Sequence, residues 1–174
     1  MEAEYRGLQL RTSDEDPEHA GYFELAGQGQ LAMQLCEACG LLRATFSCAC
    51  PFCQSDRWRW RPVSGRGTIY SWFMVEQAVH PAFRGWTPYP VVLVELEEQR
   101  DVPWRDGRDG ETVSLRVIAN LVTRGDPAIA EIEDNLVIGA AVQVCFVPLG
   151  DDAALPQFRI AEPALPVGGS GSQP

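Results

Sequence analysis

The segment Cys36-Glu-Ala-Cys39, followed after ten residues by Cys50-Pro-Phe-Cys53, decides how the first third of this 174-residue chain folds. Each cysteine pair brackets a two-residue turn, which brings its two sulfurs close enough to bind one ion. Two such turns supply the four thiolates of a tetrahedral zinc site, and this spacing is typical of zinc ribbons. We therefore predict a rubredoxin-like ribbon that holds one zinc ion through Cys36, Cys39, Cys50 and Cys53.

Cys48, two residues before Cys50, is the alternative fourth ligand. We favour Cys50, because a Cys-x-Cys segment makes a poorer chelating turn than Cys-Pro-x-Cys. Four cysteines fill the shell of a zinc ion, whereas catalytic zinc keeps one position for water, so the predicted role is structural. A redox role would need a helix N-terminus in a βαβ setting, which this sequence does not supply. The sixth cysteine, Cys145, lies in an apolar strand and is expected to be a small buried residue.

The residues on either side of the cysteines predict one helix and two strands. Asp16-Pro17 supplies an N-cap and a proline at the first helical position, which predicts a helix over residues 17–26. Alternating apolar residues predict a strand over 30–35. Arg57-Trp-Arg-Trp-Arg61 has the same period, so its arginines and its tryptophans should lie on opposite faces of a second strand. The helix and the ribbon together are expected to occupy residues 16–62.

The rest of the chain predicts a small barrel. Asp126-Pro127 marks the start of an expected helix between the third and fourth strands. A helix in that place matches the order of the OB fold, a five-stranded barrel. The fold class is therefore predicted as mainly β, with an N-terminal helix and a zinc ribbon before a five-stranded OB-fold barrel. Its expected strands cover residues 68–76, 91–98, 113–123, 141–147 and 157–160.

The chain divides into four parts on this interpretation. Residues 1–15 are polar and are expected to be flexible, and the helix and ribbon follow at 16–62. The OB-fold domain is placed at 63–163. Residues 164–174 end in Gly, Ser and Pro, the composition of a linker, and are expected to be disordered.

The charge and the hydropathy limit the function classes. The chain carries 14 basic and 24 acidic side chains, a net charge of −10. This balance disfavours nucleic-acid binding, which draws most of its affinity from basic side chains on phosphates. No apolar run approaches the roughly 20 residues that span a bilayer, and the N-terminus lacks the pattern of a secretory signal. We therefore expect a cytoplasmic protein.

A series of short motifs extends beyond the cysteines. The chain resembles the bacterial and archaeal family of zinc-ribbon OB-fold proteins associated with acyl-CoA enzymes. The resemblance covers about residues 17–160. It rests on the short aromatic helix, the Gly-Gln-Leu before the first cysteine pair, the two cysteine pairs themselves, Ser64-Gly-Arg-Gly-Thr-Ile-Tyr-Ser71, His80-Pro-Ala-Phe83, Pro90-Val-Val-Leu-Val-Glu-Leu96, Ile138-Gly139 and Leu155-Pro-Gln-Phe158.

The resemblance implies an accessory role. Members of that family are partners of thiolase-fold enzymes, including lipid-transfer-protein-like thiolases and the aldolases that shorten steroid side chains. The implied partner is a thiolase-like or lipid-transfer-protein-like subunit in a hetero-oligomer. Residues 99–112 form a polar insertion that looks most like the partners of the steroid aldolases.

Coenzyme A offers phosphates for arginine, an adenine for aromatic stacking and a pantetheine arm for an apolar slot. His80 could orient a substrate carbonyl, or it could be a turn histidine that bonds to backbone. The arginines could equally be the wet face of a ribbon strand, and Trp104 could either anchor a partner or pack on its own chain. The candidate contacts for coenzyme A or a partner are Arg59, Arg61, Trp72, His80, Phe83, Arg84 and Trp104.

Two functions from different classes follow. The first is a non-catalytic accessory subunit of a thiolase-fold acyl-CoA enzyme, because no nucleophile with a positioned base is recognisable in the sequence. The alternative is a free-standing nucleic-acid-binding module, since zinc ribbons and OB barrels both serve that purpose elsewhere. The alternation of arginine and tryptophan at 57–61 favours it, and the net charge opposes it.

Overall fold

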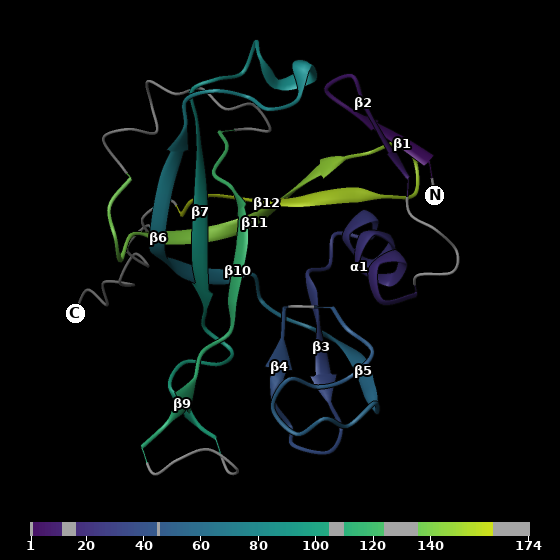
Figure 1. The fold of residues 1–174 in the computed structure, drawn as a ribbon, viewed down its shortest axis with the longest axis vertical. Coiled ribbons are helices and arrows are strands. Elements are labelled where there is room, and N and C mark those ends of the chain that lie inside the picture. The colour runs from purple at the N-terminus through teal and green to yellow at the C-terminus, as the bar shows by residue number, and fades with distance from the viewer. Residues whose placement is uncertain (1, 12–16, 45, 105–109, 124–135, 162–174) are drawn as a thin grey trace, which may run out of the picture.

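The computed structural model describes residues 2–11, 17–44, 46–104, 110–123 and 136–161. Figure 1 shows a barrel in the upper part of the molecule, a small ribbon domain below it, and one helix, α1 (Pro17–Gly27), beside both. The described strands form four sheets of two, five, three and two strands. The prediction of a mainly β chain with one N-terminal helix is confirmed.

The five-stranded sheet is the barrel. Its order is β10-β7-β6-β11-β12, with all neighbours antiparallel. A parallel bridge between Leu121 and Phe158 then brings the two outer strands together and nearly closes the sheet. In chain order the strands therefore neighbour one another as 3-2-1-4-5, with 5 returning to 3, which is the OB fold. They are β6 (Arg66–Val75), β7 (Tyr89–Leu96), β10 (Arg116–Asn120), β11 (Ala141–Pro148) and β12 (Ala154–Ile160).

The barrel core follows from period-2 alternation. On β7 every second residue is buried, and Val92, Val94 and Leu96 have no exposed surface. Ile69 of β6 and Phe158 of β12 complete the centre of the same cluster. A register shift between Ile69 and Ser71 leaves Tyr70 as a bulge, so β6 turns at that point.

The ribbon is a three-stranded sheet that shares its core with the barrel. It consists of β3 (Ala32–Cys36), β4 (Leu42–Arg43) and β5 (Trp58–Pro62), in the order β4-β3-β5. Leu31, Met33, Leu35 and Leu42 belong to the same buried cluster as the barrel residues. The ribbon therefore does not stand apart as an independent unit.

Gln99 joins the ribbon to the barrel by a second route. Its side-chain amide accepts from the Leu42 N–H at 2.8 Å and donates to the Leu42 C=O at 3.0 Å. The two residues are 57 positions apart, and both are buried. Because β4 is an edge strand, the amide of Gln99 takes the place of a neighbouring strand at this position.

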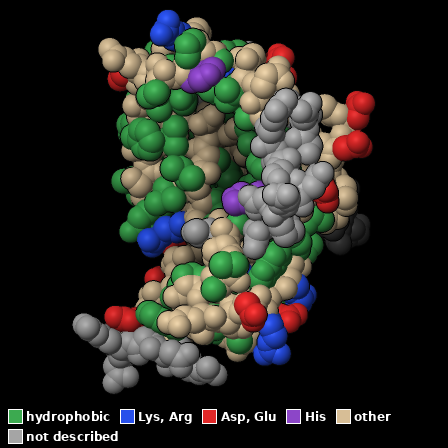
Figure 2. All heavy atoms as spheres, turned by 45° about the vertical axis from the view of Figure 1, so that its right-hand side comes forward, with side chains coloured by type: hydrophobic (Ala, Val, Ile, Leu, Met, Phe, Trp, Pro, Cys, Tyr) green, Lys and Arg blue, Asp and Glu red, His purple; other side chains and the backbone are tan. Residues whose placement is uncertain are grey.

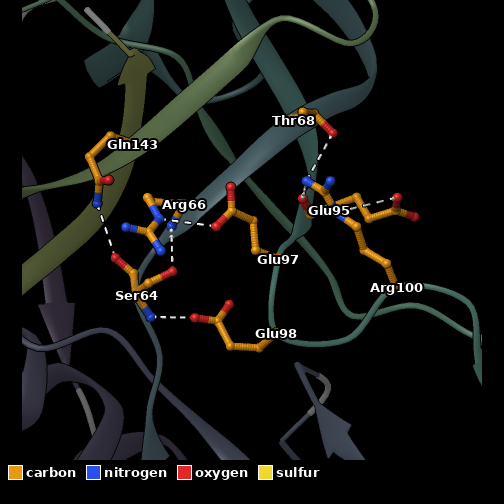
Figure 3. A network of polar contacts seen from close by, with 8 residues as sticks. All are labelled: Ser64, Arg66, Thr68, Glu95, Glu97, Glu98, Arg100 and Gln143. Atoms are coloured by element: carbon orange, nitrogen blue, oxygen red, sulfur yellow. Dashed lines mark hydrogen bonds and ion pairs between the residues drawn. The ribbon is translucent and has the colours of Figure 1, made fainter. Parts of the chain in front are cut away.

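The connection from β5 to β6 is fixed by backbone and polar contacts. Gly65 has φ +69, and a Cβ there would collide with Val144 of β11, so a larger residue is excluded. Figure 3 shows the surrounding network, in which Arg66 donates to Glu97 at 3.0 Å and Gln143 donates to the Ser64 carbonyl at 3.1 Å. The linker is thereby tied to both neighbours of β6.

Residues 2–11, part of the segment 1–15 that the sequence predicts to be flexible, have regular secondary structure. They form a hairpin of β1 (Glu2–Tyr5) and β2 (Leu8–Arg11), with Arg6 and Gly7 at φ 56 and 81 in the turn. Left-handed φ at both positions is the geometry of tight two-residue hairpins. Tyr5 is buried in a small cluster with Leu149 and Ala153. This apolar contact is not apparent from the segment itself, which is mostly polar.

The described residues of the polar insertion form a two-stranded arm. Within 99–112, β8 (Val102–Pro103) pairs with β9 (Thr112–Val113), so the predicted third barrel strand at 113–123 is shorter in the structure, where it spans β10. A short 3-10 helix, η1 (Pro81–Phe83), lies between β6 and β7. The expected helix after Asp126 and the tail 164–174 lie outside the described residues.

Candidate functional site

The four predicted zinc ligands meet at one point. Their sulfur atoms all lie within 4.8 Å of one another. The Cys36 and Cys53 sulfurs are 3.6 Å apart, and those of Cys39 and Cys50 are 3.8 Å apart. A tetrahedral ion with Zn–S bonds of about 2.3 Å places its sulfurs about 3.8 Å apart. The cluster therefore has the donor set and the spacing of a tetrathiolate metal site.

Local backbone bonds create the two chelating turns. The first turn joins β3 to β4, where Gly40 N–H donates to the Cys36 carbonyl at 2.9 Å. In the second turn Gln54 N–H donates to the Cys50 carbonyl at 2.8 Å. Each bond spans four residues, and each closes a loop that presents two sulfurs to the same side. The two halves of the site thus have the same local construction.

The thiols influence each other. Burial alone would raise the pKa of Cys36, but the backbone N–H groups of Cys39 and Ala38 and the neighbouring thiols outweigh it and lower the pKa to about 6. Burial, together with the other three sulfurs, raises the pKa of Cys39 to about 12. One thiolate in the cluster therefore opposes the ionisation of another, which a bound cation would relieve.

Cys48 is exposed and stands outside the group of four sulfurs that could share an ion among the described residues. The choice of Cys50, which is 2% exposed, over Cys48 agrees with this geometry. Cys145 on β11 is partly buried rather than fully enclosed, and burial raises its pKa.

The strand of alternating arginine and tryptophan does not display its aromatic rings. On β5, Trp58 and Trp60 are half-buried and contact each other at 5.3 Å between ring centroids. Trp60 also meets Phe46 at 5.4 Å. Arg59 and Arg61 are exposed on the same strand, and Arg59 lies 3.9 Å from the Glu37 carboxylate. The indoles pack the ribbon, so they do not form a free stacking platform for bases.

His80 caps η1. Its Nδ1 accepts from the Ala82 N–H at 3.2 Å, as expected of a turn histidine. Phe83 lies between the rings of Tyr5 and Tyr89, with centroids 6.2 and 6.4 Å away. Arg84 is exposed at the C-cap of η1.

Sequence reasoning missed several residues of this cluster, among them Arg6 and Trp86. The Arg6 guanidinium lies 3.2 Å from the centroid of the Trp86 ring, so the N-terminal hairpin packs against the loop that carries His80 and Phe83. No motif in the sequence links Arg6 to Trp86, because the contact depends on how the hairpin folds back.

Trp72 lies elsewhere, in an exposed aromatic patch on the second half of β6. Tyr70, Trp72 and Phe73 are 46, 39 and 53% exposed. The Arg116 guanidinium lies 3.6 Å from the Tyr70 ring centroid. Apolar side chains therefore lie on both faces of this half of the strand.

Trp104 packs on the zinc ribbon. It lies on the insertion arm, and its ring meets that of Phe52 at 5.9 Å with an edge-to-face angle. Phe52 is one of the two residues between Cys50 and Cys53. The seven candidate contacts are therefore not gathered in one site: they lie on the ribbon edge, on β6, around η1 and on the arm.

A hydrophobic groove runs between α1, the ribbon and the barrel. One section of about 330 Å³ and another of about 320 Å³ share Tyr22 and Ile118 in their walls. Figure 2 shows this side of the molecule hollowed and lined with hydrophobic side chains. Burial raises the pKa of Tyr22 to about 12. Each section has the volume of a small-ligand site.

Residues 60–147 match the model described as "ChsH2, C-terminal OB-fold domain". The chain belongs to this family. The match begins on β5 and ends on β11, so it includes the connection from ribbon to barrel. The resemblance inferred from the sequence motifs is therefore confirmed.

Two relatives are similar to this chain over most of its length. The solved structure titled "Ltp2-ChsH2(DUF35) aldolase" contains a chain that is 32% identical, with a TM-score of 0.62 and coverage of 87% of this chain and 98% of that one. "Probable enoyl-CoA hydratase alpha subunit" of Thermomonospora curvata is 34% identical over 146 residues. The chain spans about 38% of the length of that curated relative. No helix among the described residues is long and apolar enough to cross a membrane.

Proposed function

We propose that this chain is a non-catalytic accessory subunit of a thiolase-fold acyl-CoA enzyme that cleaves carbon–carbon bonds in lipid or steroid side chains. One observation carries the proposal: the chain is similar, over 98% of that chain, to a member of a structure titled as an aldolase with both an Ltp2 and a ChsH2 component. The name of the Thermomonospora curvata relative also describes a subunit of an acyl-CoA enzyme.

The residues of the chain support a role without chemistry of its own. His80, one of two histidines in the sequence, uses Nδ1 to accept a backbone N–H. The four clustered cysteines would fill the coordination shell of an ion and leave no position for water or substrate. A covalent mechanism needs a nucleophile beside a positioned base, and neither centre supplies that pair.

The metal in this proposal is structural zinc. Thiolate ligands at this spacing fit zinc, and bound zinc would neutralise the repulsion among the four sulfurs. Cys36, Cys39, Cys50 and Cys53 would hold it. Zinc would then fix the ribbon, whose β3 and β4 residues form part of the shared core.

The acyl-CoA contacts remain part of the proposal. The hydrophobic groove offers an apolar slot for a pantetheine or acyl chain. Exposed Arg84, with Phe83 and His80 beside it, offers a phosphate-binding cation and aromatic surface. Arg59 and Arg61 on the ribbon edge form a separate basic strip that suits partner contact.

The experiment is a reconstitution with acyl-CoA substrate. The purified chain is assayed alone, the thiolase-like enzyme encoded beside it is assayed alone, and then the two are combined. We expect no turnover by the chain alone and full activity only in the complex. Turnover by the isolated chain that is lost in His80→Ala would contradict the accessory role.

A further inference from the structure

The second half of β6 has a free edge. β11 pairs with β6 only at Arg66, Gly67 and Thr68, and the last backbone bonds on that side reach Ile69. From Ser71 to Val75, pairing with β7 continues on the other side. Figure 1 shows this half of β6 running upward beyond β11. Among the described residues no strand pairs with its outer edge.

The direction of the unpaired groups follows from a proline. Met74 lies opposite Pro90, which has no N–H, and the Pro90 carbonyl accepts from Leu121 N–H on the far side of β7. Pro90 therefore turns away from β6, and Met74 opposite it forms a pair without hydrogen bonds. The backbone N–H and C=O of Met74 therefore point away from β7, toward the free edge. Because these directions alternate along a strand, the backbone groups of Trp72 also point to the free edge, whereas those of Phe73 point to β7.

The side chains along this edge are apolar on both faces. Trp72 lies opposite Val92 and so belongs to the inner face, but it is 39% exposed because β11 does not cover it. Phe73, on the other face, is 53% exposed. An unpaired edge strand of apolar residues with high β-propensity is a common template for the addition of another strand. The segment from Tyr70 to Val75 carries no charged side chain that would oppose such pairing.

We infer that residues 71–75 of β6 accept an extended segment of the partner enzyme as an additional β-strand. The inference rests on the proposed function, since the occupant belongs to the partner. Two donors and two acceptors in alternation match the backbone of an extended peptide and no compact ligand. The exposed rings on both faces fit a segment with aromatic or β-branched residues at successive positions. A second copy is disfavoured, because each chain carries a net charge of −10.

The direct test is hydrogen exchange at single-residue resolution, on the chain alone and in complex with the thiolase-like enzyme encoded beside it. We expect the amides of Trp72 and Met74 to exchange at least tenfold more slowly in the complex. The Phe73 amide, which already bonds to β7, should be protected in both states. Unchanged exchange at Trp72 and Met74 in a complex that forms would overturn the inference and leave the proposed function standing. Failure of any complex to form would overturn both.

A matched pair of variants tests the same point by affinity. Met74→Ala and Met74→Pro both remove the thioether, but only proline removes the edge N–H. We expect Met74→Pro to bind the partner about tenfold more weakly than Met74→Ala, with unchanged zinc content and circular dichroism. Equal affinities of two folded variants would overturn the inference. If Met74→Pro does not fold, the exchange measurement decides, and sedimentation of the free chain tests the remaining occupant: a concentration-dependent dimer that protects the same amides would assign the edge to a second copy.

Discussion

Replacing Gln99 with alanine should weaken the attachment of the ribbon to the barrel. The amide of Gln99 makes two bonds to Leu42, at 2.8 and 3.0 Å, and both residues are buried. Removing the amide leaves the buried Leu42 N–H and C=O without partners, at a cost of about 1–2 kcal/mol for each group. We expect the free energy of unfolding to fall by about 3 kcal/mol.

The measurement is denaturant unfolding of the zinc-loaded chain, followed by tryptophan fluorescence and by circular dichroism. Gln143→Ala is the matched control, because its amide makes one bond, to the exposed Ser64 carbonyl at 3.1 Å. That control should cost under about 1 kcal/mol. If the two variants are equally stable, the Gln99 amide does not hold β4, and the shared hydrophobic core alone joins the two parts.

Three further outcomes are expected. Cys50→Ser should bind no zinc and lose the ribbon, whereas Cys48→Ser should keep one zinc per chain; elemental analysis with the reverse pattern would transfer the ligand role to Cys48. Because the pKa of Tyr22 is raised to about 12 from its ordinary 10, its stabilising effect is complete below pH 10 and is lost as pH rises toward 12. The unfolding free energy of the parent should therefore fall by about 2 kcal/mol more than that of Tyr22→Phe between about pH 10 and pH 12, and parallel pH curves would refute the assignment. Trp104→Ala should lower stability by about 1 kcal/mol through loss of the Phe52 contact, measured by thermal unfolding, and an unchanged midpoint would show that the arm does not brace the ribbon.

The parts of the fold that could be predicted from the sequence depend on residues that lie close together in the chain. The cysteine spacing places four sulfurs together because each turn is local. The helix predicted at 17–26 is α1, which begins at the predicted proline, Pro17. The five barrel strands followed from segments of alternating apolar residues, each of which buries one face.

The features that escaped prediction depend on contacts between distant residues. Tyr5 finds its apolar partners near Leu149, so the hairpin could not be inferred from residues 1–15 alone. Gln99 looks like any polar loop residue until β4 is placed beside it. A tyrosine at position 70 does not by itself indicate a bulge, yet the bulge determines which backbone groups of β6 face outward. The relative positions of the seven candidate contacts also depend on the tertiary fold, so the sequence could identify these residues but not show which of them lie together.

The predicted metal and the exposed edge of β6 are linked by packing and not by direct contact. Met33, Leu35 and Leu42 of the ribbon lie in one buried cluster with Ile69, the residue of β6 that precedes the bulge. A ribbon that unfolds without its ion would withdraw these side chains from the base of β6, and an interior packed this closely does not tolerate the loss of several side chains. The edge beyond Tyr70 would then lose the support that fixes its direction. A structural ion that touches neither substrate nor partner would in this way still govern the surface on which the partner docks.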